Sequence, residues 1–410
     1  MGIVRTLRSV ASFSRPTLSR RTRKLERAAN IADLRLLARA RLPRGIFDYI
    51  DGGAEDEITM HRNSDAFRDY EFIPRILRNV ADIDTSTTLL GRPLSSPLIF
   101  SPTGFTRIAH SQGELSVARV AAKHGLPYCL STLSTRSIEE VAGVSNGPKW
   151  FQVYVWRDRG LVRDMLSRAQ AHGYEAIMLT VDTAVLGRRE RDVRRGFTLP
   201  PKLGPGTIID GILHPAWTLD FVRNDPITFA NISGANGGDT GTAVTLSNFI
   251  SQQFDPALSW DDIEWFRSNW NGPIILKGVQ SVADSVKAQQ AGIDAIALSN
   301  HGGRQLDAAP APLSLVAPVA QATNGTIPII CDGGVRRGSD IVKAISLGAT
   351  ACTMGRSYLY GLGAAGEAGV EKALSLLTDD LQRTMALCGV RNIAEITPDL
   401  TSRITPDSHS

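Results

Sequence analysis

The stretch Ala295-Ile-Ala-Leu-Ser-Asn-His-Gly-Gly-Arg-Gln-Leu-Asp307 joins a short apolar run to a polar, glycine-rich loop. The run Ala295–Leu298 is typical of a buried strand, and the loop follows its carboxyl end. Two glycines let the backbone turn sharply, which can bring the side chains of His301 and Arg304 to one point. An imidazole beside a fixed cation suits removal of a proton from a substrate that is held by its carboxylate. The competing interpretation is an ordinary polar loop in which His301 caps a turn.

Seven more strand-like runs occur along the chain, and most are almost continuously apolar, as parallel strands buried on both faces are. Helix-like segments, such as 112–123, 161–171, 282–291 and 339–347, separate most of them. This alternation predicts an α/β fold with a single (β/α)8 TIM barrel. The eight expected strands are Leu98–Pro102, Pro127–Thr132, Trp150–Val155, Ala176–Asp182, Pro273–Gly278, Ala295–Asn300, Ile327–Gly334 and Ala351–Gly355.

Polar and charged side chains collect where these runs end. Barrels of this type carry their chemistry on the loops that follow the carboxyl ends of the strands. A barrel folded for stability alone has no need of such an arrangement, so we expect an active site at this face. The side chains concerned are Thr103, Ser131, Gln152, Tyr154, Thr180, Asp182, Lys277, His301, Arg304, Asp332, Arg336 and Arg356.

Composition narrows the class of protein. The chain has 410 residues and 42% hydrophobic residues, enough for one barrel with insertions. A net charge of +4 gives no case for nucleic-acid binding, and no apolar run approaches the length of a membrane-spanning helix. The spacing of the four cysteines fits no metal site, so no metal is expected. Three of them, Cys129, Cys331 and Cys352, fall inside expected strands and are predicted to be buried thiols in a reducing compartment; the fourth is Cys388.

The two ends of the chain are expected to lie outside the domain. Residues 1–25 contain seven arginines and lysines and no acidic residue. Residues 1–29 therefore suit a mitochondrial presequence if the source is eukaryotic, or a disordered basic arm that touches anionic lipid. We favour the arm, because no periodic apolar face is evident. A helix over 31–40 then opens a domain spanning 30–400, and 401–410 is expected to be a flexible tail.

One long insertion, residues 183–272, separates the fourth and fifth expected strands. Segments of this length in a compact barrel are usually lids, binding loops or disordered. Its basic and apolar stretches suit a lid that faces a membrane or a quinone. A helical cover packed on the barrel or on a neighbouring subunit fits equally well.

Two glycine–arginine loops predict a phosphate site. Asp332-Gly-Gly-Val-Arg-Arg-Gly338 follows the seventh strand, and Gly355-Arg356 follows the eighth. Barrels often hold phosphate at these two loops, with backbone N–H groups and a helix N-terminus. Two ordinary tight turns are the alternative. A Rossmann dinucleotide site is not expected, because no strand–turn–helix unit carries Gly-x-Gly-x-x-Gly.

Lys277 ends the fifth strand and has three possible roles. It could form a Schiff base, hold a phosphate, or place a fixed charge beside a cofactor. Gln152 and Thr180, at neighbouring strand ends, offer hydrogen bonds to a heteroaromatic edge. They favour the third role, and an isoalloxazine ring with a phosphate tail would use all of these groups.

With these features the chain resembles the FMN-dependent L-2-hydroxy-acid dehydrogenases. This is the family of glycolate oxidase, L-lactate dehydrogenase and (S)-mandelate dehydrogenase. The resemblance covers about residues 30–400. The segments that carry it, all in the family's order, are Phe47–Glu57, Pro102–Gly104, Trp150–Tyr154, Leu179–Asp182, Gly187–Asp192, Leu276–Gly278, Ser299–Asp307 and Asp332–Gly338.

The resemblance implies FMN as the cofactor and a role for each site residue. It implies that His301 is the active-site base, paired with Asp182, and that Tyr154 contacts the substrate hydroxyl or the developing keto oxygen. Arg304 and Arg189, helped by Tyr49, would bind the substrate carboxylate. Lys277 would face the N1–C2 edge of the flavin. The remaining cofactor contacts implied are Pro102, Thr103, Gly104, Ser131, Gln152, Thr180, Ser299 and Asp332, with Gly333, Gly334, Arg336, Gly355 and Arg356 at the phosphate.

The resemblance also bears on the substrate and the partners. Glycolate oxidases carry alanine and tryptophan where this chain has Gly104 and Leu133, so a larger acid is expected, L-lactate first. (S)-Mandelate oxidation and an oxidase that uses O2 are the alternatives, and the intact His301–Arg304–Asp182 set argues against a non-catalytic FMN-binding barrel. Similarity to bacterial quinone-linked members implies a quinone or another carrier as acceptor, with peripheral membrane contact. A homotetramer is expected, in the cytoplasm or at the inner face of the cytoplasmic membrane, or in mitochondria if the source is eukaryotic.

Overall fold

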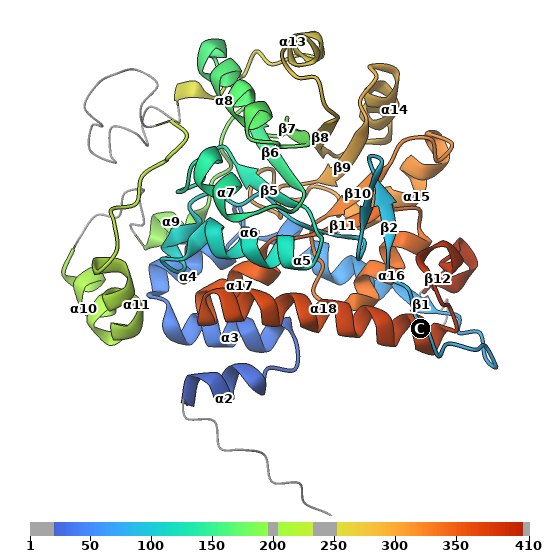
Figure 1. Cartoon of the computed structure of the whole chain (residues 1–410), viewed down its shortest axis with the longest axis horizontal. Coiled ribbons are helices and arrows are strands. Elements are labelled where there is room, and N and C mark those ends of the chain that lie inside the picture. The colour runs from blue at the N-terminus through green and yellow to red at the C-terminus, as the bar shows by residue number, and fades with distance from the viewer. Residues whose placement is uncertain (1–19, 196–203, 233–251, 405–410) are drawn as a thin grey trace, which may run out of the picture.

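The computed structural model describes residues 20–195, 204–232 and 252–404 of the chain. Its centre is a closed barrel of eight parallel strands, which confirms the predicted fold (Figure 1). Each strand pairs with the next one along the chain, and the last strand closes on the first. The strands are β4 (Leu98–Phe100), β5 (Tyr128–Ser131), β6 (Lys149–Tyr154), β7 (Ala176–Thr180), β8 (Ile274–Val279), β9 (Ala295–Ser299), β10 (Ile329–Asp332) and β11 (Ala351–Met354).

The strands are apolar throughout because both of their faces are buried. Alternate side chains point to opposite sides of a strand. Ile99 and Met178 therefore belong to a small cluster inside the barrel, whereas Leu98 and Ile177 belong to the larger cluster between strands and helices. All four cysteines are buried and free, which confirms the expectation for the three in strands and adds Cys388.

Helices surround the barrel and confirm the predicted alternation. They are α6 (Gly113–Lys123), α7 (Ile138–Val144), α8 (Arg159–Ala171), α13 (Asp262–Asn269), α14 (Val282–Gln290), α15 (Pro312–Ala322), α16 (Gly338–Ser346), α17 (Arg356–Ala365) and α18 (Glu367–Cys388). A hairpin of β2 (Thr87–Leu89) and β3 (Arg92–Leu94) packs Leu89 and Leu94 against the inner cluster. Short 3-10 helices span Ala66–Asp69, Thr106–Ile108, Ile393–Glu395 and Pro398–Leu400.

Folded structure begins earlier than the expected boundary at residue 30. The amino-terminal helices are α2 (Arg20–Glu26), α3 (Ile31–Arg41), α4 (Arg44–Asp51) and α5 (Ile58–Asp65). The Arg21 guanidinium donates two hydrogen bonds, of 3.2 and 2.9 Å, to the Ala364 carbonyl in α17. This contact between distant segments explains why composition alone placed α2 outside the domain. The rest of the expected basic arm, residues 1–19, lies outside the described residues.

Folded structure also extends beyond residue 400, where the flexible tail was expected to begin. β12 (Thr401–Arg403) pairs antiparallel with β1 (Tyr70–Phe72), and the Ile404 N–H donates to the Asp69 carbonyl. These backbone hydrogen bonds fix residues 401–404, while 405–410 lie outside the described residues. The strand is short and half-exposed, so it lacks the apolar run by which a strand is recognised.

The described part of the insertion contains α13, and before it α9 (Glu190–Arg194), α10 (Pro205–Leu213) and α11 (Pro215–Val222). α11 packs on the barrel, because Trp217 donates to the Ile108 carbonyl at 2.8 Å and Asp220 accepts from Ser111 at 2.6 Å. Figure 1 shows α10 and α11 at the edge of the molecule, beside the amino-terminal helices. No helix in the described ranges is long and apolar enough to span a membrane.

Candidate active site

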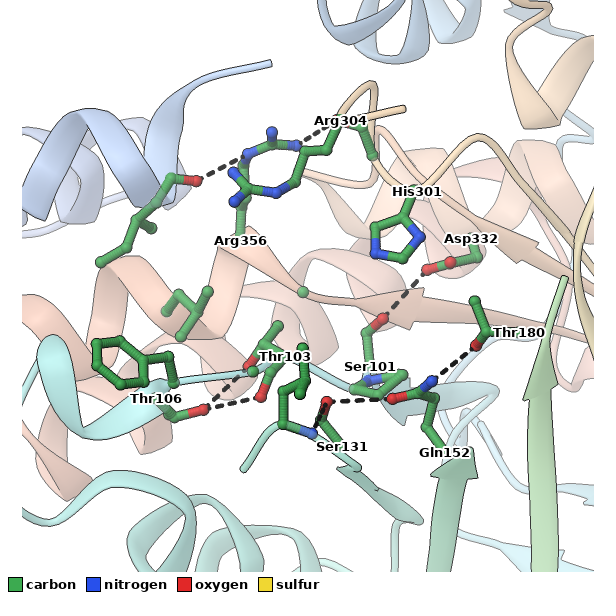
Figure 2. Close-up of a pocket in the computed structure, with 18 of the residues that line it drawn as sticks. Ser101, Thr103, Thr106, Ser131, Gln152, Thr180, His301, Arg304, Asp332 and Arg356 are labelled. Atoms are coloured by element: carbon green, nitrogen blue, oxygen red, sulfur yellow. Dashed lines mark hydrogen bonds between the residues drawn. The ribbon is translucent and has the colours of Figure 1, made fainter. Parts of the chain in front are cut away.

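A cavity of about 380 Å³ opens at the carboxyl ends of the strands (Figure 2). Every sequence-predicted site residue lines it except Asp182 and Ser299, which lie directly behind lining residues. The barrel brings them together because parallel strands end at one face. Their placement was therefore predictable from strand order. The hydrogen bonds and ion pairs that join them were not.

His301 and Asp182 form a hydrogen-bonded pair at the cavity wall. The His301 Nδ1 atom lies 3.1 Å from Oδ1 of Asp182, whose side chain is only 2% exposed. Burial lowers the pKa of His301, although Asp182 opposes that shift. Burial alone would raise the pKa of Asp182, but His301 holds it below its usual value. With Nδ1 donating to Asp182, the lone pair of the neutral ring is on Nε2, which can accept a proton.

The loop that carries His301 is held in an uncommon conformation. His301 has φ of 59°, in the left-handed region that non-glycine residues rarely adopt. Gly303 has φ of 75°, and a Cβ there would lie 2.6 Å from the Met60 backbone nitrogen in α5. Asp307 anchors the loop by accepting hydrogen bonds from the Ile58 and Thr59 N–H groups at the start of α5. The loop is thus fixed by a helix distant in sequence.

Two arginines lie against the aromatic ring of Tyr49. The guanidinium carbons of Arg304 and Arg189 lie 5.0 and 5.7 Å from the centre of its ring. Arg304 also donates to the Tyr49 carbonyl at 2.7 Å. Burial lowers the pKa of Arg304 to about 9, and the charge of Arg189 acts in the same direction. Two cations this close to one ring would be stabilised by a carboxylate placed between them.

Lys277 is the centre of a buried polar network. Its Nζ atom lies 3.1 Å from both Oγ of Ser299 and Oδ2 of Asp332. Asp332 also accepts hydrogen bonds from Ser101, at 3.2 Å, and from Thr353. Burial opposes a charge on Lys277, yet Asp332 holds the lysine pKa above its usual value. A charged amine cannot form a Schiff base, so the structure argues against the first of the three possible roles.

This network changes the expectation for Asp332, which was predicted as a cofactor contact. Asp332 lines the cavity, but both of its carboxylate oxygens are bonded to protein groups. Asp332 therefore stabilises the charged amine of Lys277. Ser101 and Thr353 were missed, although both are hydroxyl residues at or next to a strand end and could have been found by that signal.

Three adjacent strands end in a chain of hydrogen bonds along one side of the cavity (Figure 2). The Gln152 amide oxygen accepts from Ser131 Oγ at 3.1 Å, and its amide nitrogen donates to Thr180 Oγ1 at 3.0 Å. Burial raises the pKa of the neighbouring Tyr154 phenol to about 12, so it stays protonated. This edge offers both donors and acceptors to a flat heteroaromatic ring.

The loops after β10 and β11 form the opposite end of the cavity. The backbone N–H groups of Gly333, Gly334 and Gly355 donate to no group within the described ranges. Unpaired N–H groups are costly when buried, and together with the start of α17 they suit a phosphate. Gly334 admits no side chain, because a Cβ would lie 1.9 Å from the Asn63 carbonyl oxygen. Arg336 lines this end as well.

Arg356 adds charge at this end but is held by the chain. Its guanidinium, labelled in Figure 2, donates to the carbonyls of Gly302 at 2.7 Å and Ile50 at 3.1 Å. It also donates to the Gly52 carbonyl at 2.7 Å. Arg356 thereby ties the loop of His301 to the end of α4. Taken together, the cavity fits a ligand with an anionic phosphate at one end and a heteroaromatic ring at the other.

The insertion contributes two aromatic lining residues that sequence reasoning missed, Phe229 and Phe254. The Phe254 ring lies edge-on to Tyr154, with 5.2 Å between centroids. No periodic pattern marks either residue in the sequence, so no signal could have placed them here. Gly104 and Leu133, the two positions behind the expectation of a larger acid, are neighbours at the cavity wall. A Cβ at Gly104 would lie 3.0 Å from Cβ of Leu133, so the added bulk would press on Leu133.

Comparison with known proteins agrees with this geometry. The family model described as FMN-dependent dehydrogenase matches residues 38–403. The chain is 43% identical to a putative L-lactate dehydrogenase of Mycobacterium tuberculosis, over 96% of this chain and 94% of that one. It is 41% identical to an L-lactate dehydrogenase of Allorhizobium ampelinum, over 90% and 97%. A crystal structure of the monotopic membrane protein (S)-mandelate dehydrogenase has a TM-score of 0.89 and 39% identity, over 92% of this chain and all of that one.

Proposed function

The chain belongs to the family of FMN-dependent dehydrogenases, and on that premise we propose that it oxidises L-lactate to pyruvate. The observation that carries the proposal is the shared cavity. The His301–Asp182 pair opens onto the same space as Arg304 and Arg189. A base and a carboxylate site that open onto one cavity suit a small 2-hydroxy acid.

FMN fits the residues present. The N–H groups of Gly333, Gly334 and Gly355, with Arg336, would hold its phosphate. The Gln152 edge and the Lys277 ammonium would contact the ring. When bound, FMN supplies the redox chemistry, taking up the two electrons that leave the substrate. Because Lys277 stays charged, it would stabilise negative charge that develops beside it.

The chain's own residues would bind and deprotonate the substrate. Arg304 and Arg189 would hold the carboxylate through their planar guanidinium groups. Nε2 of His301 would accept the proton, and Asp182 would stabilise the imidazolium. Tyr154 would donate a hydrogen bond to the substrate oxygen, since its phenol is protonated at neutral pH.

(S)-Mandelate is the second candidate substrate. Leu133, Phe229 and Phe254 give the cavity an apolar side that can contact an aromatic ring, and Gly104 carries no side chain. The solved relative named as an (S)-mandelate dehydrogenase points the same way. L-Lactate remains the first choice because the two relatives compared by sequence bear that name.

For the electron acceptor we propose a quinone reached at a membrane. α10 presents exposed Ile208, Ile209, Ile212 and Leu213, with Ile212 70% exposed. An exposed apolar patch on one helix suits shallow burial in a bilayer. The relative described as monotopic supports contact without a spanning helix. We further propose that the protein is a homotetramer at the inner face of the cytoplasmic membrane.

The test is anaerobic reduction of the bound flavin. The purified protein should contain FMN, and L-lactate should bleach its absorbance faster than glycolate does, with (S)-mandelate as the second comparison. Re-oxidation by a soluble quinone analogue, measured against oxygen consumption, separates a dehydrogenase from an oxidase. The proposal is wrong if no L-2-hydroxy acid bleaches the flavin.

A further inference from the structure

A second cavity, of about 700 Å³, lies between the amino-terminal helices and the insertion. Residues of α3, α4, α9 and α10 line it. The carboxyl end of α4 and the residues that follow it separate this cavity from the active site. Asp51 faces the second cavity, whereas the Tyr49 and Gly52 carbonyls accept hydrogen bonds from Arg304 of the active site. It is therefore a separate site that the proposed reaction does not use.

Five arginines and three aspartates face this cavity. Each of the three aspartates is already bonded to groups of the protein. Asp51 is bonded to Arg35 at 2.5 and 2.7 Å and to Arg191 at 3.0 Å, and it also accepts from Tyr360 at 2.7 Å. These contacts hold the pKa of Asp51 at about 2 against the effect of burial. The carboxylate of Asp51 thus has no capacity left for another cation.

The other two aspartates are also paired. Asp48 accepts from Arg195 at 2.9 Å. Asp210 accepts from the backbone N–H of Arg44 at 2.6 Å and lies 3.3 Å from the His214 ring. No described carboxylate lining the cavity is therefore left without a partner.

Two guanidinium groups remain. Neither Arg39 nor Arg44 forms a side-chain hydrogen bond or ion pair with any residue in the ranges 20–195, 204–232 and 252–404. Guanidinium groups bind phosphate oxygens through parallel hydrogen bonds. A cavity with two such unpaired groups and an excess of positive charge suits a phosphate anion.

The rim of the cavity indicates where that phosphate comes from. Leu213 lines the cavity and is 67% exposed. It belongs to the same helix as the exposed side chains of Ile208, Ile209 and Ile212. Exposed arginines beside an exposed apolar helix match an amphiphile whose head is a phosphate and whose tail is hydrocarbon.

We propose that this cavity binds the phosphate headgroup of an anionic phospholipid, with Arg39 and Arg44 as its contacts and the apolar side chains of α10 beside the acyl chains. The inference rests on the membrane contact proposed above and specifies the lipid that the contact selects. A soluble phosphate would satisfy the arginines but would leave α10 exposed.

The test compares vesicles of phosphatidylcholine alone with vesicles that also contain phosphatidylglycerol. Each arginine near an anionic membrane strengthens binding roughly fivefold. The double variant Arg39→Gln/Arg44→Gln should therefore lose roughly 30-fold in partitioning to the phosphatidylglycerol vesicles, with partitioning to phosphatidylcholine unchanged. The matched control is Arg383→Gln/Arg403→Gln, which removes the same charge from α18 and β12, outside the lining of the second cavity.

The inference is overturned if the double variant binds anionic vesicles as tightly as the control. It is also overturned if inorganic phosphate raises the melting temperature of the wild type alone while all variants bind vesicles equally, because the site would then take free phosphate. A wild type that binds neither vesicle removes the proposed membrane contact and this inference with it. Anaerobic flavin reduction by L-lactate, measured without vesicles on the same samples, tests the proposed oxidation separately and shows that each variant is folded.

Discussion

At the level of single residues, the proposed role of His301 is to accept the proton of the substrate. His301→Gln keeps the size and polarity of the side chain but removes the basic nitrogen. We expect FMN to stay bound and the rate of flavin reduction by L-lactate to fall about 10²–10⁴-fold. Stopped-flow absorbance under anaerobic conditions measures the rate. Turnover close to that of the wild type would exclude His301 as the base.

The pH dependence of the same step tests the pair with Asp182. The base acts when neutral, so the reduction rate should be constant above the His301 pKa and should fall as the pH drops through it. Burial places that pKa below its ordinary value of 6.5, and Asp182 raises it. Asp182→Asn should therefore move the fall in rate to lower pH. It should also reduce the plateau, because the imidazolium loses its partner. A shift to higher pH would contradict the assigned pairing.

At the level of elements, β8 and β10 are joined across the barrel mouth by Lys277 and Asp332. Removing one partner of a buried ion pair leaves the other uncompensated, at a cost of about 3–5 kcal/mol. Lys277→Met should therefore destabilise the protein strongly, whereas Lys277→Met/Asp332→Asn should cost less than the two single changes added together. Denaturant unfolding at a fixed FMN concentration measures the three variants. Additive losses would show that the pair is not coupled.

The crossing of α17 and α18 depends on glycine. A Cβ added at Gly361 would lie 2.1 Å from the Gly369 carbonyl oxygen, so Gly361→Ala must separate the helices. We expect it to lower the free energy of unfolding by at least about 1–3 kcal/mol. Gly143→Ala in α7 is the control, since a Cβ there meets nothing within 4 Å and should add about 0.4–1 kcal/mol. Equal stabilities for the two variants would exclude a tight crossing.

At the level of the whole molecule, Asp220 fastens the insertion to the barrel. It accepts from Arg41 at 3.2 Å and from Ser111, which follows the cavity-lining segment 101–109. Asp220→Ala should increase hydrogen exchange in 205–222 and in 105–112, with the strands unaffected. It leaves Arg41, whose side chain is only 8% exposed, without its ion-pair partner.

Asp399→Ala is the control for this change, because Asp399 is 71% exposed and its pair with Arg75 should contribute little. Hydrogen-exchange mass spectrometry compares the two variants. Unchanged exchange in 205–222 of Asp220→Ala would show that other contacts hold α11.

The pattern of apolar runs was enough to predict the barrel and the face that carries the site. Strands buried on both sides must be apolar, so eight apolar runs separated by helices were enough to identify the architecture. Parallel strands end at one face, so the residues that follow them lie close together at that face. His301, Lys277 and Gln152 could be assigned to one cavity for that reason alone. The role of each residue is still a prediction that the variants above test.

The contacts between segments far apart in the chain could not be predicted from the sequence and are seen only in the folded protein. The docking of α2 on α17, the pairing of β12 with β1 and the arrival of Phe254 beside Tyr154 leave no periodic trace in the sequence. The same holds for the partners of Asp332 and for the arginine-lined cavity. Local patterns report the environment of a residue along its own helix or strand. The partner that completes each contact is set by how whole elements pack, and packing is a property of the folded chain.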